Sequence, residues 1–136
     1  MRIWKLPCRE LDSQHLLGEH RELHGLWSIL LREAEQRKTG ERRRIGYAHH
    51  PETARWRGRL GAIYLRHEEE VEEMSRRGFT GHRTPLDRGL VGDDSWESPP
   101  VTEEDLARDR RDLAAHTPGW RKAAGQAGRS GSLPSV

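Results

Sequence analysis

The fold is decided by residues 13–38, which read SQHLLGEHRELHGLWSILLREAEQRK. Apolar side chains recur in this stretch at the spacing of an α-helix and form one stripe, made of Leu16, Leu23, Trp27, Leu30 and Ala34. Asp12 or Ser13 can cap the start of this helix, and Gly40 is a favoured residue just beyond its end. We therefore expect a long helix with one face packed against a core.

Two further helices are expected downstream. The second begins at Pro51, a favoured first helical residue, and ends at Gly78, a favoured stop. Its apolar stripe consists of Trp56, Leu60, Ile63, Tyr64, His67, Val71 and Met74. The third starts where Thr102 and Asp105 approximate a capping box, and it stops before Pro118.

The segment between the second and third helices, residues 79–100, is rich in Gly, Pro, Asp and Arg. Such a composition predicts a long loop that drapes over the core or carries function. The sequence shows no internal repeat and no credible pair of strands. The predicted fold class is all-α: a single compact domain of three main helices with long connecting loops. This helical domain spans residues 1–125, residues 126–136 form a flexible tail, and we expect a monomer.

Composition narrows the class of protein. Of 136 residues, 32% are hydrophobic and 34% are charged, and no run of about 18 apolar residues is present, so we expect no membrane partner. The first residues contain no apolar segment of the signal-peptide type. The single Cys8 excludes an internal disulfide, favours a reducing cytoplasm, and is expected to be a small buried side chain, not a nucleophile.

The net charge of +2 is unevenly distributed along the chain. Residues 32–66 contain ten Lys or Arg and four Glu, whereas residues 67–112 contain seven Arg and fourteen Asp or Glu. A basic segment followed by an acidic segment is typical of a protein that turns one side towards a polyanion. Charge runs are often no more than solvated faces, so this pattern alone supports a nucleic-acid partner only weakly.

Candidate catalytic side chains lie along one edge of the first helix. His15, Glu19 and Glu22 fall within about 60° of one another at helical spacing. Gly18 and Gly25 flank Glu22, and each costs a helix about 1 kcal/mol relative to Ala. Glycines tolerated at that cost indicate a close approach, either by another segment of this chain or by a ligand.

The α-amino group at residue 1 is a possible nucleophile. Its unperturbed pKa is about 7.7–8.0, against about 10.4 for lysine, so near pH 7 a useful fraction is uncharged and able to form an imine. Every protein has such an amine, so this observation permits the chemistry without indicating it.

The histidines contain no zinc signature of the His-Glu-x-x-His kind, and we expect no metal site. His20 and His24 lie one helical turn apart and are expected to face solvent or a partner. His67 lies on the apolar stripe of the second helix, where a core histidine with satisfied hydrogen bonds is expected.

One motif in the first helix is specific to a known family. Gln14-His15-Leu16, then Glu19, then Arg21-Glu22-Leu23 resembles the pyrimidine-dimer DNA glycosylase family of the phage endonuclease V type. The similarity continues to Arg77-Gly78-Phe79 and returns weakly around Trp120 and Gly125. The opening Met1-Arg2-Ile3-Trp4 and residues 50–86 look like the bacterial branch of that family.

The resemblance implies an all-α domain that needs no metal or cofactor and acts on double-stranded DNA containing a damaged or abasic site, in the cytoplasm and associated with the nucleoid. The N-terminal amine, here Met1, would attack the sugar carbon bearing the damaged base, form an imine and cleave the strand by β-elimination. Glu22 matches the family's catalytic glutamate. The residues that the resemblance and the basic character assign to DNA are Arg2, His15, Arg21, Arg42, Arg43, Arg44, Arg55, Arg57, Arg59 and Trp120.

The sequence departs from the family pattern at three places. Arg2 is bulky, so we expect Met1 to be retained where the phage enzyme exposes a threonine. Gly25 replaces an arginine that follows the phage motif. The phage enzyme has an aromatic-rich patch near its C-terminus, and of that patch only Trp120 remains in this sequence.

Two other functions stay open from the residues alone. One is a helical nucleic-acid-binding protein that has lost catalysis, which Gly25 and the altered C-terminal patch would suit. The other is a metal-dependent hydrolase built on the histidines, for which the sequence gives less support.

Overall fold

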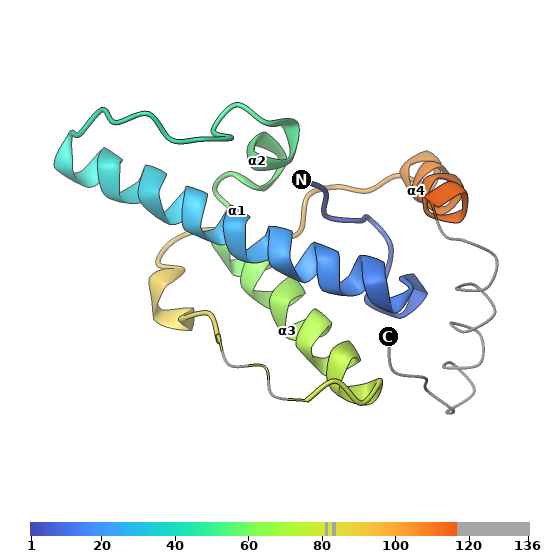
Figure 1. The fold of residues 1–136 in the computed structure, drawn as a ribbon. Helices are drawn as coiled ribbons and strands as arrows, with labels where there is room; N and C mark the ends of the chain where they lie inside the picture. The colour runs from blue at the N-terminus through green and yellow to red at the C-terminus, as the bar shows by residue number, and fades with distance from the viewer. Residues whose placement is uncertain (81, 83, 117–136) are drawn as a thin grey trace.

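Helix α1, Ser13–Thr39, runs through the whole molecule, and the other elements are arranged around it (Figure 1). The computed structural model describes residues 1–80, 82 and 84–116, and it contains α-helices and short 3-10 turns but no strand within those residues. Asp12 caps α1, since its side chain accepts a hydrogen bond from the His15 N–H at 3.1 Å. Gly40 ends it in a left-handed conformation, φ 76°. The predicted first helix is confirmed.

The predicted second helix is wrong in one respect, because it is two helices. Helix α2, Pro51–Trp56, ends at a turn in which Gly58 has a φ of 77°, and helix α3, Leu60–Arg76, follows. A residue in that conformation cannot continue a helix, and glycine adopts it without strain. The Gly58 carbonyl accepts a hydrogen bond from the Ser95 N–H at 2.9 Å, so the long loop before α4 packs against the break between α2 and α3.

Helix α4, Glu103–His116, starts with the predicted capping box. The Thr102 N–H donates to Asp105 Oδ2 and the Asp105 N–H donates to Thr102 Oγ1, each at 3.0 Å. The 3-10 turns η1, Cys8–Glu10, and η2, Arg88–Leu90, lie before α1 and within the long loop. Val91 of that loop is buried, which confirms that the loop drapes over the core.

Two hydrophobic clusters form the core. The larger joins α1, α2 and α3 and contains Ile3, Leu23, Leu26, Trp27, Leu30, Trp56, Leu60, Ala62, Ile63 and Val91. The smaller lies under the N-terminal residues and contains Trp4, Leu6, Cys8, Leu11, Leu16 and Met74. Cys8 is therefore a buried side chain, as expected, and burial raises the pKa of its thiol. None of the helices described here is long and apolar enough to cross a membrane.

The predicted domain boundary at residue 125, the tail at 126–136 and the stop at Pro118 all lie outside the described residues. The all-α fold is confirmed, and residues 1–116, apart from 81 and 83, contain four α-helices where three were expected.

Candidate active site at the N-terminal segment

The first five residues, called here the N-terminal segment, lie in an extended conformation beside α1 and are bound by the helices around them (Figure 1). The Trp4 N–H donates a hydrogen bond to Glu19 Oε1 at 2.7 Å. The Trp4 carbonyl accepts one from Arg66 Nη2 at 3.1 Å. Both backbone groups of Trp4 are thus fixed by charged side chains from α1 and α3.

The Glu19–Arg66 ion pair is buried beneath this segment. Arg66 Nε donates to Glu19 Oε2 at 2.9 Å and Arg66 Nη2 donates to Glu19 Oε1 at 3.0 Å, so the pair is bidentate. Neighbouring Glu70 is fully buried, and burial with Glu19 alongside raises the pKa of Glu70 to about 11. Glu70 is therefore neutral, and Glu19 supplies the charge that balances Arg66.

Helices α2 and α4 bind the same segment from other sides. Asp109, 2% exposed, accepts from the Lys5 N–H at 2.7 Å and from Arg2 Nη2 at 2.8 Å. Arg2 also donates to Asp112 at 2.9 Å and stacks on the Trp4 ring. Arg55 of α2 donates to the Ile3 carbonyl at 2.9 Å. Each of the four helices therefore contributes at least one hydrogen bond to the N-terminal segment, which fixes where the chain's end lies.

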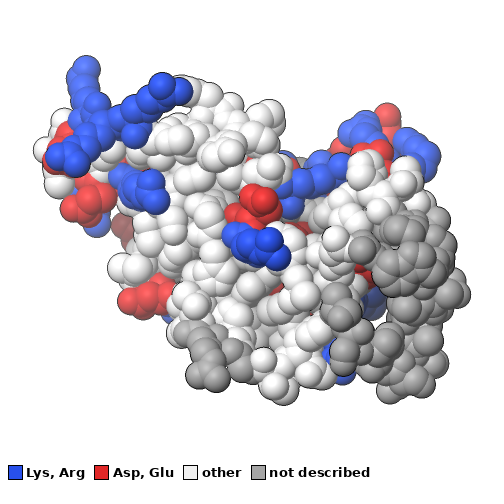
Figure 2. Space-filling model, in the orientation of Figure 1, with Lys and Arg blue, Asp and Glu red and all other residues white. Residues whose placement is uncertain are grey.

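Met1 and Glu22 are the two residues expected to carry the chemistry. The Met1 side chain packs against the larger core cluster, which includes Leu23, the residue next to Glu22. Glu22 and Arg21 are exposed, and neither makes a hydrogen bond or ion pair with any residue in the described part of the chain. In Figure 2 the outline of the molecule is hollowed between the side that carries α2 and the side that carries α4, and the N-terminus lies at this hollow in Figure 1.

The two glycines that flank Glu22 stand in open space. A Cβ added to Gly18 or Gly25 would meet no heavy atom within 4 Å. Of the two alternatives left open by the sequence, tight packing by another segment of this chain does not occur among the described residues. Open glycines on the face that carries Glu22 leave room for a second molecule to approach the helix backbone.

His15 and Glu19, which share a helix edge with Glu22, have different surroundings. His15 Nδ1 lies 2.5 Å from Asp12 Oδ2, and its ring meets that of Trp4 edge-on at 5.6 Å. Glu19 is turned inwards to Arg66. Of the three, only Glu22 presents its carboxylate to solvent, so the three side chains do not form one catalytic cluster.

Of the arginines expected to contact DNA, Arg2 is engaged by Asp109 and Asp112 and Arg21 is exposed, and the other six fall into two groups. Arg55 pairs with Glu52 as well as Ile3, Arg57 is bidentate to Glu33 with both contacts at 2.9 Å, and Arg59 donates to the Glu97 carbonyl at 2.8 Å. These contacts give this group a role within the fold. The other group, Arg42, Arg43 and Arg44, is exposed in the loop after α1, and its side chains bind nothing else that the structure describes.

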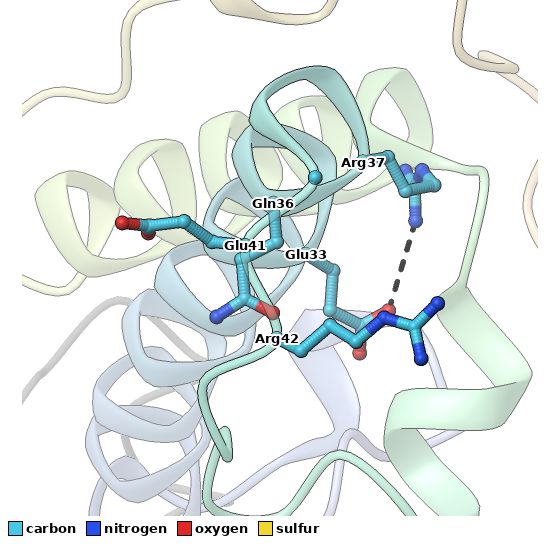
Figure 3. Close-up of a pocket in the computed structure, with 6 residues that line it drawn as sticks. Glu33, Gln36, Arg37, Glu41 and Arg42 are labelled. Carbon is cyan, nitrogen blue, oxygen red and sulfur yellow. Dashed lines mark ion pairs between the residues drawn. The ribbon is translucent and has the colours of Figure 1, made fainter.

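Basic side chains gather over the C-terminal end of α1 and this loop (Figure 2). A shallow groove of about 370 Å³ lies there, lined by Glu33, Gln36, Arg37, Gly40, Glu41 and Arg42. Figure 3 shows Arg37 and Arg42 on either side of Glu33, with Arg37 3.9 Å from its carboxylate. The groove contains neither Met1 nor Glu22, so it is part of the basic surface and separate from the candidate catalytic pair.

The histidines are arranged differently from the expectation. His20 and His24 do not face only solvent: both rings contact His67 of α3, at 4.8 and 4.9 Å between centroids. His67 is buried and its Nδ1 lies 3.0 Å from Glu68, but its Nε2 has no hydrogen-bond partner among the described residues, so it is only half satisfied.

Sequence reasoning did not find Arg66 and Asp109 as parts of this site. Both are charged residues on amphipathic helices, where solvent exposure is the usual outcome. The only available signal was the position of Arg66 close to the apolar stripe of its helix. The partners of Asp109 are 104 and 107 residues away, a separation that no local pattern reveals. Trp120 lies outside the described residues.

The family model of pyrimidine dimer DNA glycosylases matches residues 1–86, well over half of the chain. The chain belongs to the pyrimidine dimer DNA glycosylase family. The matched region includes the N-terminal segment, the whole of α1, α2 and α3, and therefore Met1, Glu19, Glu22 and Arg66. Helix α4, which supplies Asp109, lies beyond it. Comparison with curated proteins and with solved structures gave no match. Family membership confirms the resemblance read from the first helix and makes this a DNA-repair glycosylase by family.

Proposed function

We propose that this protein is a DNA glycosylase with abasic-site lyase activity on damaged duplex DNA, with pyrimidine dimers as the lesion. The observation that carries the proposal is the binding of the N-terminal segment by Glu19, Arg55, Arg66 and Asp109. A segment bound from several sides restricts where its terminal amine can lie, and the unpaired Glu22 stands one helical turn from Glu19, which binds this segment. Preorganisation of that kind is what an imine-forming enzyme requires.

In the proposed reaction the uncharged Met1 amine attacks C1′ of the sugar that carries the damaged base. The bond between C1′ and the base breaks, and its electron pair leaves with the base. The Glu22 carboxylate takes the proton that the attached Met1 nitrogen loses and delivers it to the ring oxygen as the C1′–O4′ bond opens, which leaves an iminium between the Met1 nitrogen and C1′. The resulting carboxylate stabilises that cation.

Strand cleavage uses the same two groups. The Glu22 carboxylate removes a proton from C2′, and the electron pair of that bond expels the 3′ phosphate by β-elimination. Water then hydrolyses the imine and returns the free amine. Glu22 is available for these transfers because it is exposed and makes no contact within the described part of the chain.

The basic surface gives the duplex its anchors. Arg21 is adjacent to Glu22, and Arg42, Arg43 and Arg44 follow the end of α1. The helix rises about 1.5 Å per residue, so Glu22 and Gly40 are about 27 Å apart along its axis, or about eight base pairs of B-DNA. The duplex would therefore lie along α1, with its backbone passing over the open Gly18 and Gly25.

Borohydride trapping tests the nucleophile. Reduction during the reaction should link the native protein covalently to both dimer-containing and abasic duplexes through Met1. Acetylation of the α-amine should abolish the adduct, and Lys5→Arg, which removes the only lysine of the segment, should not. Trapping that survives acetylation would refute the role of Met1, and salt-dependent binding without any adduct would favour the non-catalytic alternative.

Glu22→Gln tests the acid and base. The variant should lose strand cleavage by at least about 100-fold while its affinity for DNA changes little, because general acid–base catalysis contributes about 10²–10⁴-fold. Glu35→Gln is the matched control, since Glu35 is also an exposed glutamate of α1. Equal cleavage by the Glu22 and Glu35 variants would remove Glu22 from the mechanism.

A further inference from the structure

Four imidazoles from separate parts of the chain meet on the side of α1 that faces α3. His20 and His24 come from successive turns of α1, His67 comes from α3, and His82 comes from the segment after α3. One ring nitrogen of each lies within 4.8 Å of the corresponding nitrogen of every other. No part of the proposed glycosylase reaction uses these side chains.

The spacing of the nitrogens is close to that of a tetrahedral metal site. Zinc–imidazole bonds of about 2.0–2.1 Å place the nitrogens of a tetrahedral site about 3.3 Å apart. The separation of His20 Nε2 and His24 Nε2 is 3.2 Å, and that of His20 Nε2 and His82 Nε2 is 2.7 Å. One nitrogen of every ring is turned towards the others, since the four ligand atoms all lie within 4.8 Å of one another.

Carboxyl groups contact the Nδ1 atoms of two of the rings. His20 Nδ1 lies 2.8 Å from Glu70 Oε1, and His67 Nδ1 lies 3.0 Å from Glu68 Oε1. Histidines that bind metals commonly have a carboxylate on the other ring nitrogen, because it fixes the ring's orientation and tautomer. In both rings the nitrogen left over is Nε2, which points into the cluster.

The Nε2 atom of His67 provides an independent indication. It belongs to a side chain that is 1% exposed, and it has no hydrogen-bond partner among the described residues. Leaving such an atom buried and unpaired costs about 1–3 kcal/mol. A cation at the centre of the cluster would give this nitrogen its missing partner.

We propose that His20, His24, His67 and His82 bind one divalent transition-metal ion, with Zn²⁺ as the ion that suits four imidazoles in a tetrahedron. Four protein ligands leave no open position for water, so the ion has a structural role. It fastens His82 to α1 and α3.

Metal binding by the full-length protein tests this directly. Protein stripped with a chelator should bind one equivalent of Zn²⁺ in a calorimetric titration, and Co²⁺ in its place should give the intense visible absorption of a tetrahedral site. Zn²⁺ should also raise the unfolding temperature, since a ligand of the folded state stabilises it by mass action.

Variants locate the site. His82→Ala removes an exposed ligand without opening the core, and it should weaken Zn²⁺ binding by at least about 100-fold, since loss even of an outer partner costs about 10–100-fold. His24→Ala should do the same. His49→Ala, an exposed histidine outside the cluster, is the matched control and should bind as the native protein does.

Two results would overturn the proposal: no saturable binding of Zn²⁺ by the stripped native protein, or equal affinity in the native, His82→Ala and His24→Ala proteins. An octahedral Co²⁺ spectrum would also contradict it. These readouts require no DNA, so they are independent of the outcome of borohydride trapping.

Discussion

At the scale of single residues, Glu19 is the side chain on which the N-terminal segment depends most. Its carboxylate accepts from the Trp4 N–H and also neutralises Arg66, whose side chain is 11% exposed. An uncompensated charge left in such a place costs about 3–5 kcal/mol. In the proposed reaction Glu19 is thus a positioning residue, because it would act through the backbone of Trp4.

Glu19→Gln should lower the free energy of unfolding by about 3 kcal/mol. Its single-turnover rate on abasic DNA should fall at least about tenfold, because a small misplacement of the amine is costly, while the Kd for DNA stays nearly unchanged. The rate is measured well below both unfolding temperatures. Glu69→Gln, which removes a half-exposed partner of the same Arg66, is the control and should change stability by less than about 1 kcal/mol. A folded Glu19→Gln protein with the native rate would contradict a positioning role.

Glu73 predicts how stability depends on pH. Burial alone would raise the pKa of Glu73, but hydrogen bonds from Arg76 and Arg77 outweigh it and lower the pKa below its usual range. A carboxylate with a depressed pKa in the folded state stabilises the protein above its unfolded pKa, about 4.3, and loses that contribution as pH falls through the folded pKa. Arg77 also reaches Ser13 Oγ and the Cys8 carbonyl, so this carboxylate fixes the end of α3 to the start of α1.

Glu73→Gln should therefore be less stable than the native protein at pH 7 by about 1–3 kcal/mol, as for other charged hydrogen bonds. The difference should shrink as the pH is lowered from about 4.3. Urea unfolding at several pH values measures both. Glu72→Gln, exposed and adjacent in sequence, should show neither effect. A difference that stays constant down to acidic pH would show that ionisation of Glu73 is not its source.

At the scale of elements, the start of α3 is the most tightly packed junction. A Cβ added to Gly61 would lie 2.5 Å from Trp96 Cδ2 and 2.8 Å from the Ser95 carbonyl oxygen. The carbonyl belongs to the backbone, and Ser95 is hydrogen-bonded to both Gly58 and Ala62, so it cannot move freely.

Gly61→Ala should destabilise the protein by about 1–3 kcal/mol through overpacking. Gly18→Ala, made in open space on α1, should instead stabilise it by about 0.5–1 kcal/mol, as alanine usually does in a helix. Thermal and urea unfolding compare the two. If the DNA backbone passes over Gly18, the same stabilised variant should bind DNA more weakly. Equal stability of the Gly61 and Gly18 variants would contradict the close contact with Trp96.

The elements also show what the sequence could reveal. Helix α1 and the capping box of α4 were predictable because caps and periodicity are local signals. The break at Gly58 was visible only as one unfavourable residue inside an otherwise helical pattern, and the docking of Ser95 and Trp96 decides it. Glu22 could be identified from a motif. The convergence of His20 and His82, 62 residues apart, could not, because it depends on how α1 packs against α3.

At the scale of the whole molecule, the arginines in the basic middle of the chain divide into an exposed group and a group that contacts other residues. The exposed Arg42, Arg43 and Arg44 stand at one end of α1, and Arg57 and Arg59, although equally basic in sequence, are engaged in contacts with other parts of the chain. Net charge alone could not distinguish these groups, because the distinction depends on which acidic or carbonyl partner each arginine meets in the fold.

Replacing Arg42, Arg43 and Arg44 together with Gln should weaken DNA binding and reduce the slope of log K against log salt by up to about 2.7, since each phosphate contact contributes about 0.9. Unfolding should be unchanged, because the three side chains bind nothing else in the described structure. The charge-matched control replaces Arg108, Arg110 and Arg111 of α4. Binding isotherms at several salt concentrations measure this slope. An unaltered slope in the triple variant would exclude this loop from the DNA interface.

The attachment of the N-terminal segment to α4 has a consequence for synthesis. The first residues to leave the ribosome find their last partner, Asp109, only after about a hundred more have been added, and at about 5–20 residues per second that takes several seconds. Until then Arg2 and Lys5 lack that anchor. Under the proposed function, the segment that carries the Met1 amine therefore gains its full set of contacts only once α4 has been made.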